Sequence, residues 1–233
     1  MEAGTVRMII EEVLKRNKVT IDDLSKTLHI SKEVVSLALR LIPGISLKNG
    51  SVVVENKLVL VIEGIKRGLP VKRLSRYVDW RDFEKLSAEI LSSHGYSVYT
   101  NVLMTKPIRL EIDVVGVDIG SGRAIVVDCK HWIHGLSPSM LYDVGRKHIE
   151  RTVKFLKYID WITRKYPLLK KVKYAVPVIV TLTTPKIRTV DRRVVIVNIG
   201  EFNNFLQDIH LVLDELGIET IARENTGTLE SLL

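Results

Sequence analysis

The chain has 233 residues, of which 46% are hydrophobic, and carries a formal net charge of +8. This length allows two domains with buried cores, and the single cysteine, Cys129, excludes a fold held together by internal disulfides. The first residues lack the basic and apolar regions of a signal peptide, and the apolar runs are too short to cross a membrane. We therefore expect a cytoplasmic protein with no membrane partner.

The first part of the chain is predicted to form three short helices followed by a hairpin. Apolar residues recur at helical spacing over residues 5–16, and Thr20 and Ser31 are suited to cap the two helices that follow. An Asn-Gly pair at 49–50 separates two short apolar segments, which predicts the hairpin. This order resembles a winged helix-turn-helix domain, expected over residues 1–56. Its third helix offers few cations to DNA, so contact with protein or dimerisation is an equal alternative.

A basic helical connector is expected over residues 57–78, followed by a larger domain over residues 79–216 and a polar tail over residues 217–233. The larger domain should open with a helix that starts at Asp79, and alternating strands and helices follow, which predicts an α/β fold. Gly145 weakens the longest helix and could divide it. The elements after the opening helix are expected at 96–103, 108–117, 123–131, 137–166, 174–182, 193–199 and 201–216.

Charged side chains gather in the hairpin expected between residues 108 and 131. Because side chains alternate between the two faces of a strand, Glu111 and Asp113 share one face of the first strand. Asp128 and Lys130 likewise share one face of the second strand. The opposite faces are apolar, as is typical of central strands, where lone carboxylates are rare. A bound cation or a set of surface salt bridges would account for these acids.

The position of the turn decides which of these groups face each other. A two-residue turn at 120–121 pairs Asp113 with Asp128, a turn at 121–122 pairs Asp113 with Lys130, and a three-residue loop would remove the shared face. Two opposed carboxylates repel unless a cation lies between them. The cation expected is Mg²⁺ or Mn²⁺, because hard divalent ions take oxygen ligands and can activate water.

The sequence around these residues resembles the PD-(D/E)xK nuclease superfamily. The matching segments are Glu-Ile-Asp-Val-Val-Gly at 111–116 and Val-Val-Asp-Cys-Lys-His-Trp at 126–132, although Ile112 stands where the usual motif has proline. Residues 79–98 resemble the opening helix and first strand of Mrr-like restriction endonucleases and archaeal Holliday-junction resolvases. The resemblance extends to residue 200 or so. It implies a mixed central sheet flanked by helices, and metal-dependent hydrolysis of phosphodiester bonds.

The resemblance also implies roles for individual residues. Asp113 and Asp128 match the two metal-binding acids, although many resolvase-like relatives have glutamate at the second position. Lys130 matches the catalytic lysine, and Glu84 matches a glutamate of the opening helix that touches the metal or its water. Supporting candidates in the same hairpin are Glu111 and His131.

The basic surplus is concentrated in the second half of the chain. Residues 143–173 hold ten Lys/Arg and three Asp/Glu, a net charge of +7, whereas residues 1–56 carry +1 and residues 200–233 carry −6. A basic helix suits the phosphates of nucleic acid. The cations of the long helix that are predicted to contact phosphate are Arg146, Lys147, Arg151 and Lys154.

These observations favour a Mg²⁺-dependent DNA endonuclease, and the resemblance allows a homodimer that cuts two strands. Two alternatives remain open. The first is a non-catalytic DNA-binding or regulatory protein that retains the nuclease fold. The second is a nuclease for branched DNA or for RNA.

Overall fold

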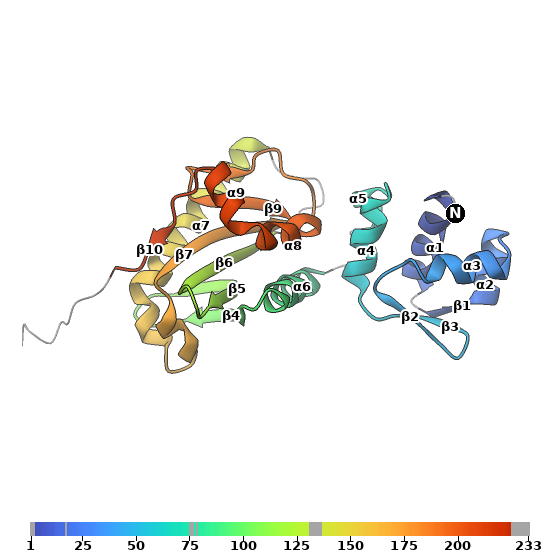
Figure 1. Cartoon of the computed structure of the whole chain (residues 1–233), viewed down its shortest axis with the longest axis horizontal. Helices are drawn as coiled ribbons and strands as arrows, with labels where there is room; N and C mark the ends of the chain where they lie inside the picture. The colour runs from blue at the N-terminus through green and yellow to red at the C-terminus, as the bar shows by residue number, and fades with distance from the viewer. Residues whose placement is uncertain (1–2, 17, 75–76, 78, 131–136, 225–233) are drawn as a thin grey trace, which may run out of the picture. The chain divides into compact units, whose positions relative to one another are not determined.

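A computed structural model describes residues 3–16, 18–74, 77, 79–130 and 137–224. The chain divides into two compact units, Met1–Phe83 and Glu84–Leu233 (Figure 1). Across these described ranges, every helix is too short or too polar to cross a membrane.

The first unit combines short helices with a small antiparallel sheet in the strand order β1-β3-β2. Thr20 caps the second helix through a reciprocal pair of hydrogen bonds with Asp23, and Ser31 caps the third, as the sequence predicted. The elements are α1 (Ala3–Arg16), β1 (Lys18–Thr20), α2 (Ile21–Leu28), α3 (Lys32–Leu39), β2 (Ile45–Lys48), β3 (Ser51–Val54), α4 (Lys57–Lys66) and α5 (Val71–Leu74). The predicted helices and hairpin are present, while the winged-helix identity of the unit stays a prediction.

Two features of the first unit bear on its predicted role. Helix α4 packs against α1 and buries Leu58, Leu60 and Val61, so it belongs to this unit's core although it falls in the expected connector. The third helix exposes Val34 and Leu37, and its exposed Lys32 is paired with Asp22 at 2.9 Å. Helices that read base edges present polar and basic groups, so this surface favours the alternative of protein contact.

The second unit is built on a mixed sheet in the order β4-β5-β6-β7-β9-β8, with β10 paired to the start of β7. Strand β7 runs parallel to β6 and β9, and the other pairs are antiparallel. Figure 1 shows α7 behind this sheet and α8 and α9 in front of it. The arrangement confirms the predicted mixed sheet flanked by helices.

The chain enters the second unit along α6 (Trp80–Ser93). The elements that follow are β4 (Ser97–Met104), β5 (Leu110–Asp118), β6 (Arg123–Lys130), α7 (Pro138–Tyr158), the 3₁₀ helices η2 (Ile159–Ile162) and η3 (Pro167–Lys171), β7 (Tyr174–Thr181), β8 (Thr189–Val190), β9 (Val194–Asn198), α8 (Ile199–Gln207), α9 (Ile209–Glu215) and β10 (Ile221–Ala222). Strands β8 and β10 were not predicted, and β10 falls within the expected polar tail.

The hairpin of β5 and β6 has the register that places the two aspartates at the same level. Its ladder runs from Asp118–Arg123 to Val114–Val127, one step before Asp113 and Asp128. The connection is four residues long instead of the predicted two, because the Asp118 side chain accepts hydrogen bonds from Gly120 N and Ser121 Oγ. A four-residue loop centred on the same point leaves the register unchanged.

The regular alternation predicted for β5 is interrupted at Asp113. Ile112 and Val115 belong to one buried cluster, although residues three apart on a regular strand point to opposite faces. On the neighbouring strand β4, Asn101 adopts a left-handed backbone with φ of 50°, and the ladder lacks the pair that Asn101 and Asp113 would form. The strand therefore turns its side chains locally at the residue that carries the first acid.

Helix α7 runs unbroken through Gly145, where the sequence allowed a break. A Cβ at this position would lie 2.7 Å from Val190 Cγ2 and 2.8 Å from Val190 Cβ. The glycine therefore lets α7 approach the edge strand β8, and this close packing outweighs its poor helix propensity.

Gly145→Ala is expected to lower the free energy of unfolding by about 1–3 kcal/mol, the usual cost of overpacking, although alanine favours helix. Urea denaturation of the full chain measures the change. The loss should be smaller in a Val190→Ala background, which makes room for the methyl group. Gly4→Ala is the control, because a Cβ there meets nothing within 4 Å in α1. An equal loss in both backgrounds would contradict the packing explanation.

Candidate active site

Asp128 lies near the carboxyl end of β6 and is buried, with 2% of its surface exposed. Its Oδ1 accepts hydrogen bonds from Arg151 Nη1 at 2.7 Å and from Lys130 Nζ at 3.1 Å. Burial raises the pKa of Asp128, but the positive charges of Lys130, Arg151 and, when protonated, His148 outweigh burial and hold the pKa below its ordinary value. The fold therefore keeps a buried, ionised carboxylate at neutral pH.

Asp113 lies on the neighbouring strand β5, and its pKa is shifted in the opposite direction from that of Asp128. Its Oδ2 accepts a hydrogen bond from the backbone N–H of Cys129 at 2.7 Å. Burial raises the pKa of Asp113 above its ordinary value, and the negative charge of Asp128 acts in the same direction. The hydrogen bond and the nearby cations only partly offset these effects. The two aspartates therefore form a pair whose pKa values are driven apart, as is typical of functional sites.

Helix α6 adds polar groups on the other side of β6. Cys129 Sγ donates to Ser87 Oγ at 3.5 Å. Glu84, one helical turn before Ser87, is buried with 6% of its surface exposed. Burial raises the pKa of the Cys129 thiol, and the negative charges of Asp113, Glu84 and Asp128 add to the effect. Asp113, Glu84 and Asp128 therefore all lie close enough to Cys129 to raise the pKa of its thiol. Glu84 thus lies near the acid pair at the end of β6.

Helix α7 supplies two groups whose contacts the sequence did not reveal. Arg151, predicted to contact nucleic acid, forms an ion pair with Asp128. His148, which sequence reasoning missed, is fully enclosed, and its Nε2 lies 2.9 Å from the carbonyl oxygen of Val126, so Nε2 carries a proton. Burial lowers the pKa of His148. A spacing of three residues puts both side chains on one side of the helix, and that spacing was the available signal.

The donor set at this site fits a hard divalent cation. Within the described ranges, no three His, Cys, Asp or Glu side chains converge closely enough to enclose a metal ion by themselves. Asp128 Oδ2 is buried and, among those residues, accepts no hydrogen bond, although Lys130 Nζ lies 2.9 Å away. Mg²⁺ commonly binds one or two carboxylates and completes its shell with water and substrate phosphate. Asp113 and Asp128 match that requirement.

A basic groove of about 410 Å³ borders the site between the start of β5 and the outer side of α7. Four cations and two acids line it: Arg109, Lys147, Arg151 and Lys154, with Glu111 and Glu150. Within the part of the chain that the structure describes, Arg109, Lys147 and Lys154 have no ion-pair partner, so their charges remain available to an anion. Arg151 both lines the groove and binds Asp128, so one side chain links the groove to the buried carboxylate.

The other residues predicted for the site or for nucleic-acid binding lie outside the acid pair. Glu111 is exposed on the wall of the groove, beside the site rather than within the acid pair. Arg146 binds Asp191 at 3.1 Å and does not line the groove. His131 lies outside the described residues.

Comparisons with known proteins bear on the second unit. Residues 75–164 match the Mrr catalytic-domain family, described as restriction endonuclease. No curated protein matches the chain significantly. Among solved structures, protein VC1899 from Vibrio cholerae is similar over 93% of this chain and 52% of its own length, with 14% identity and a TM-score of 0.33. The chain thus spans about half the length of that protein. The family match includes both strands that carry the aspartates and agrees with the resemblance that the sequence of these residues indicated.

Proposed function

We propose that this chain is a divalent-metal-dependent endonuclease that hydrolyses phosphodiester bonds in DNA. The observation that carries the proposal is the arrangement of Asp113, Asp128 and Lys130, which Arg151 links to a groove lined by Arg109, Lys147 and Lys154. The family match supports a nuclease, and an acid pair next to a basic surface is what hydrolysis of a polyanion requires.

Each residue has a definite task in this proposal. Asp113 and Asp128 would hold a Mg²⁺ or Mn²⁺ ion, which when bound supplies Lewis-acid stabilisation of charge on the phosphate. Lys130 offsets negative charge on the same phosphate and orients the attacking water. Arg151 holds the Asp128 carboxylate in place through its hydrogen bond and, together with Lys130, favours the ionised form. Glu84 supports the acid pair from α6.

A substrate panel tests the proposal. Linear, methylated, single-stranded and four-way-junction DNA, and a structured RNA, are incubated with the full chain and Mg²⁺ or Mn²⁺. At least one DNA should be cut, and chelation with EDTA should stop the cutting. Binding without cleavage of any substrate would favour the non-catalytic alternative, and cleavage of RNA alone would assign a different substrate. The homodimer stays a prediction, which sedimentation analysis of the purified chain would test by measuring its mass in solution.

The groove predicts how DNA binding depends on salt. Lys147→Ala combined with Lys154→Ala should weaken binding and reduce the slope of log K against log salt by about two, because each lysine is expected to neutralise one phosphate. Fluorescence anisotropy in EDTA measures binding without cleavage. Arg146→Ala is the control, since Arg146 lies on the same helix but binds Asp191. A double variant with an unchanged slope would exclude the groove as the DNA path.

A further inference from the structure

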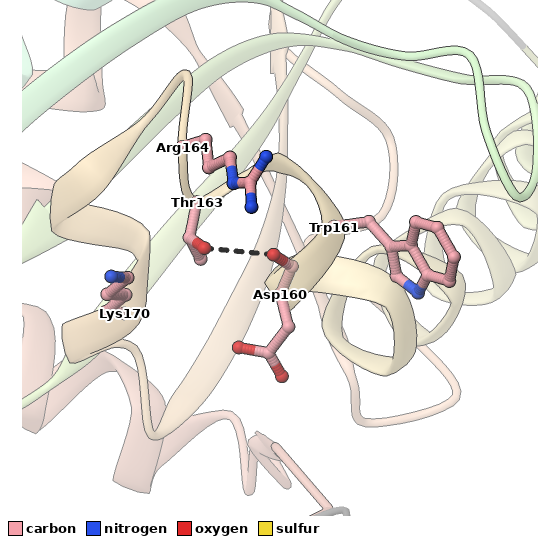
Figure 2. Close-up of a pocket in the computed structure, with 5 residues that line it drawn as sticks. All are labelled: Asp160, Trp161, Thr163, Arg164 and Lys170. Atoms are coloured by element: carbon pink, nitrogen blue, oxygen red, sulfur yellow. Dashed lines mark hydrogen bonds between the residues drawn. The ribbon is translucent and has the colours of Figure 1, made fainter.

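A second pocket of about 550 Å³ lies beyond the end of α7, where η2 and η3 face each other (Figure 2). Its lining residues are Asp160, Trp161, Thr163, Arg164 and Lys170. Trp161 is 66% exposed. Tryptophan is usually largely buried, and an exposed indole rimmed by charged groups is typical of a binding surface.

The acidic group of this pocket is already neutralised. Asp160 Oδ1 binds Arg223 Nη2 at 2.6 Å, and Arg223 Nη1 also donates to the backbone oxygens of Lys170 and Val172. These bonds fix Asp160, and Thr163 Oγ1 donates to the Asp160 carbonyl oxygen at 2.9 Å, which holds the turn. The turn and the Asp160 carboxylate are therefore held in place, and Trp161, Arg164 and Lys170 extend from this frame as exposed side chains.

The cations of the pocket remain available. Figure 2 shows Arg164 extending from the same turn as Trp161, and Lys170 entering from η3 on the other side of Asp160. In the described ranges, neither Arg164 nor Lys170 has an acidic partner. Residues 157–173 hold six Lys/Arg and one Asp, a net charge of +5. The surroundings of Trp161 therefore attract an anion.

An exposed indole and free cations together match the chemistry of an unpaired nucleotide. Base stacking on an aromatic ring needs a base whose face is open, which single strands offer and intact duplexes do not. The cations then neutralise the flanking phosphates.

The position of the pocket also suits a strand that passes the active site. Because η2 follows α7 directly, Trp161 lies roughly 16 Å along the helix axis from Arg151, at ~1.5 Å per α-helical and ~2 Å per 3₁₀ residue. This distance corresponds to about four or five duplex base steps of ~3.4 Å.

We propose that this pocket binds an unpaired nucleotide of single-stranded DNA next to the cleavage site, with Trp161 stacked on the base and Arg164 and Lys170 on its phosphates. The proposal rests on the proposed nuclease function for the identity of the ligand. It assigns the substrate class as DNA with a single-stranded end, flap or branch.

Binding to a duplex with a single-stranded overhang, compared with the same duplex blunt-ended, tests the pocket. Anisotropy is measured with the full chain in EDTA, where cleavage does not interfere. Wild type should prefer the overhang, and Trp161→Ala should reduce that preference about tenfold, within the range for loss of one base stack. Trp161→Tyr should retain most of the preference. Tyr142→Ala is the matched control, an exposed aromatic on α7 outside the pocket, and should have no effect.

Intrinsic fluorescence gives a second readout that does not depend on affinity. The chain contains three tryptophans, and single-stranded DNA should quench the part of the emission that disappears in Trp161→Phe. Unchanged quenching in Trp161→Phe, or an unchanged overhang preference in Trp161→Ala, would overturn the proposal. Cleavage is measured on the same samples. Cleavage without a Trp161 effect would refute the pocket alone, whereas a Trp161-dependent overhang preference without cleavage would refute the nuclease alone.

Discussion

Replacing Lys130 with methionine is expected to slow DNA cleavage by about 10²–10³-fold, the usual loss when one preorganised charge donor is removed from an active site. Lys130 Nζ lies within 3.1 Å of both Asp128 oxygens, and the side chain stays 27% exposed, so it can also reach a bound phosphate. Methionine keeps the length and apolar stem of lysine but removes the charge. Single-turnover cleavage with saturating enzyme measures the chemical step separately from binding.

Two controls make this result specific. DNA affinity in EDTA should change little, because the groove cations remain in place. The second control is Lys157→Met, which removes a lysine of α7 whose Nζ lies over the Tyr158 ring and which does not line the groove; this variant should cleave like wild type. Cleavage by Lys130→Met at the wild-type rate would mean that the activity comes from another site.

The register of the acid pair could be predicted because it depends on a parity rule. Two turns and a three-residue loop were open, and the structure has the register of the turn at 120–121, which sets Asp113 and Asp128 at the same level. The real loop has four residues, and a symmetric lengthening of the loop leaves pairing unchanged. The detail that selects the longer loop is the Asp118 side chain, which accepts hydrogen bonds within the turn. Such local bonds leave no periodic signal in the sequence.

The local twist at Asp113 could not be predicted for a different reason. Alternation along a strand holds while its neighbours are regular, and here Asn101 on β4 adopts a left-handed backbone opposite the acid. Asparagine tolerates this conformation better than most residues, but it also occurs in regular strands. The sequence of β5 alone therefore carries no sign of the interruption.

The contacts that α7 makes with the site could be predicted only in part from the sequence. Helical spacing predicted that Lys147, Arg151 and Lys154 share a side of α7, and all three line the groove. It did not predict that Arg151 and His148 turn toward β6. The rotation of a helix on a sheet depends on packing, for example the close contact of Gly145 with Val190. The edge strands β8 and β10 were missed because two residues are too few for a period to appear.

Asp113→Asn is expected to stabilise the metal-free protein while abolishing cleavage. Since burial and the charge of Asp128 raise the pKa of Asp113, the ionised carboxylate is less favourable in the fold than in the unfolded chain. Asparagine removes that charge, and its amide oxygen can still accept the Cys129 N–H bond. The melting temperature in EDTA at pH 7.5 should rise by roughly 2–4 °C, the shift that about 1 kcal/mol gives in a domain of this size.

The same variant should respond differently to pH and to metal. The gain in stability should shrink as the pH falls through the raised pKa of Asp113, because the wild-type side chain then becomes neutral as well. Adding Mg²⁺ or Mn²⁺ should raise the melting temperature of wild type by mass action and leave Asp113→Asn unchanged. Asp143→Asn, at an exposed acid of α7, should behave like wild type in both tests. If Asp113→Asn melts below wild type in EDTA, the carboxylate stabilises the fold through its bond to Cys129, and loss of cleavage could no longer be attributed to loss of a metal ligand.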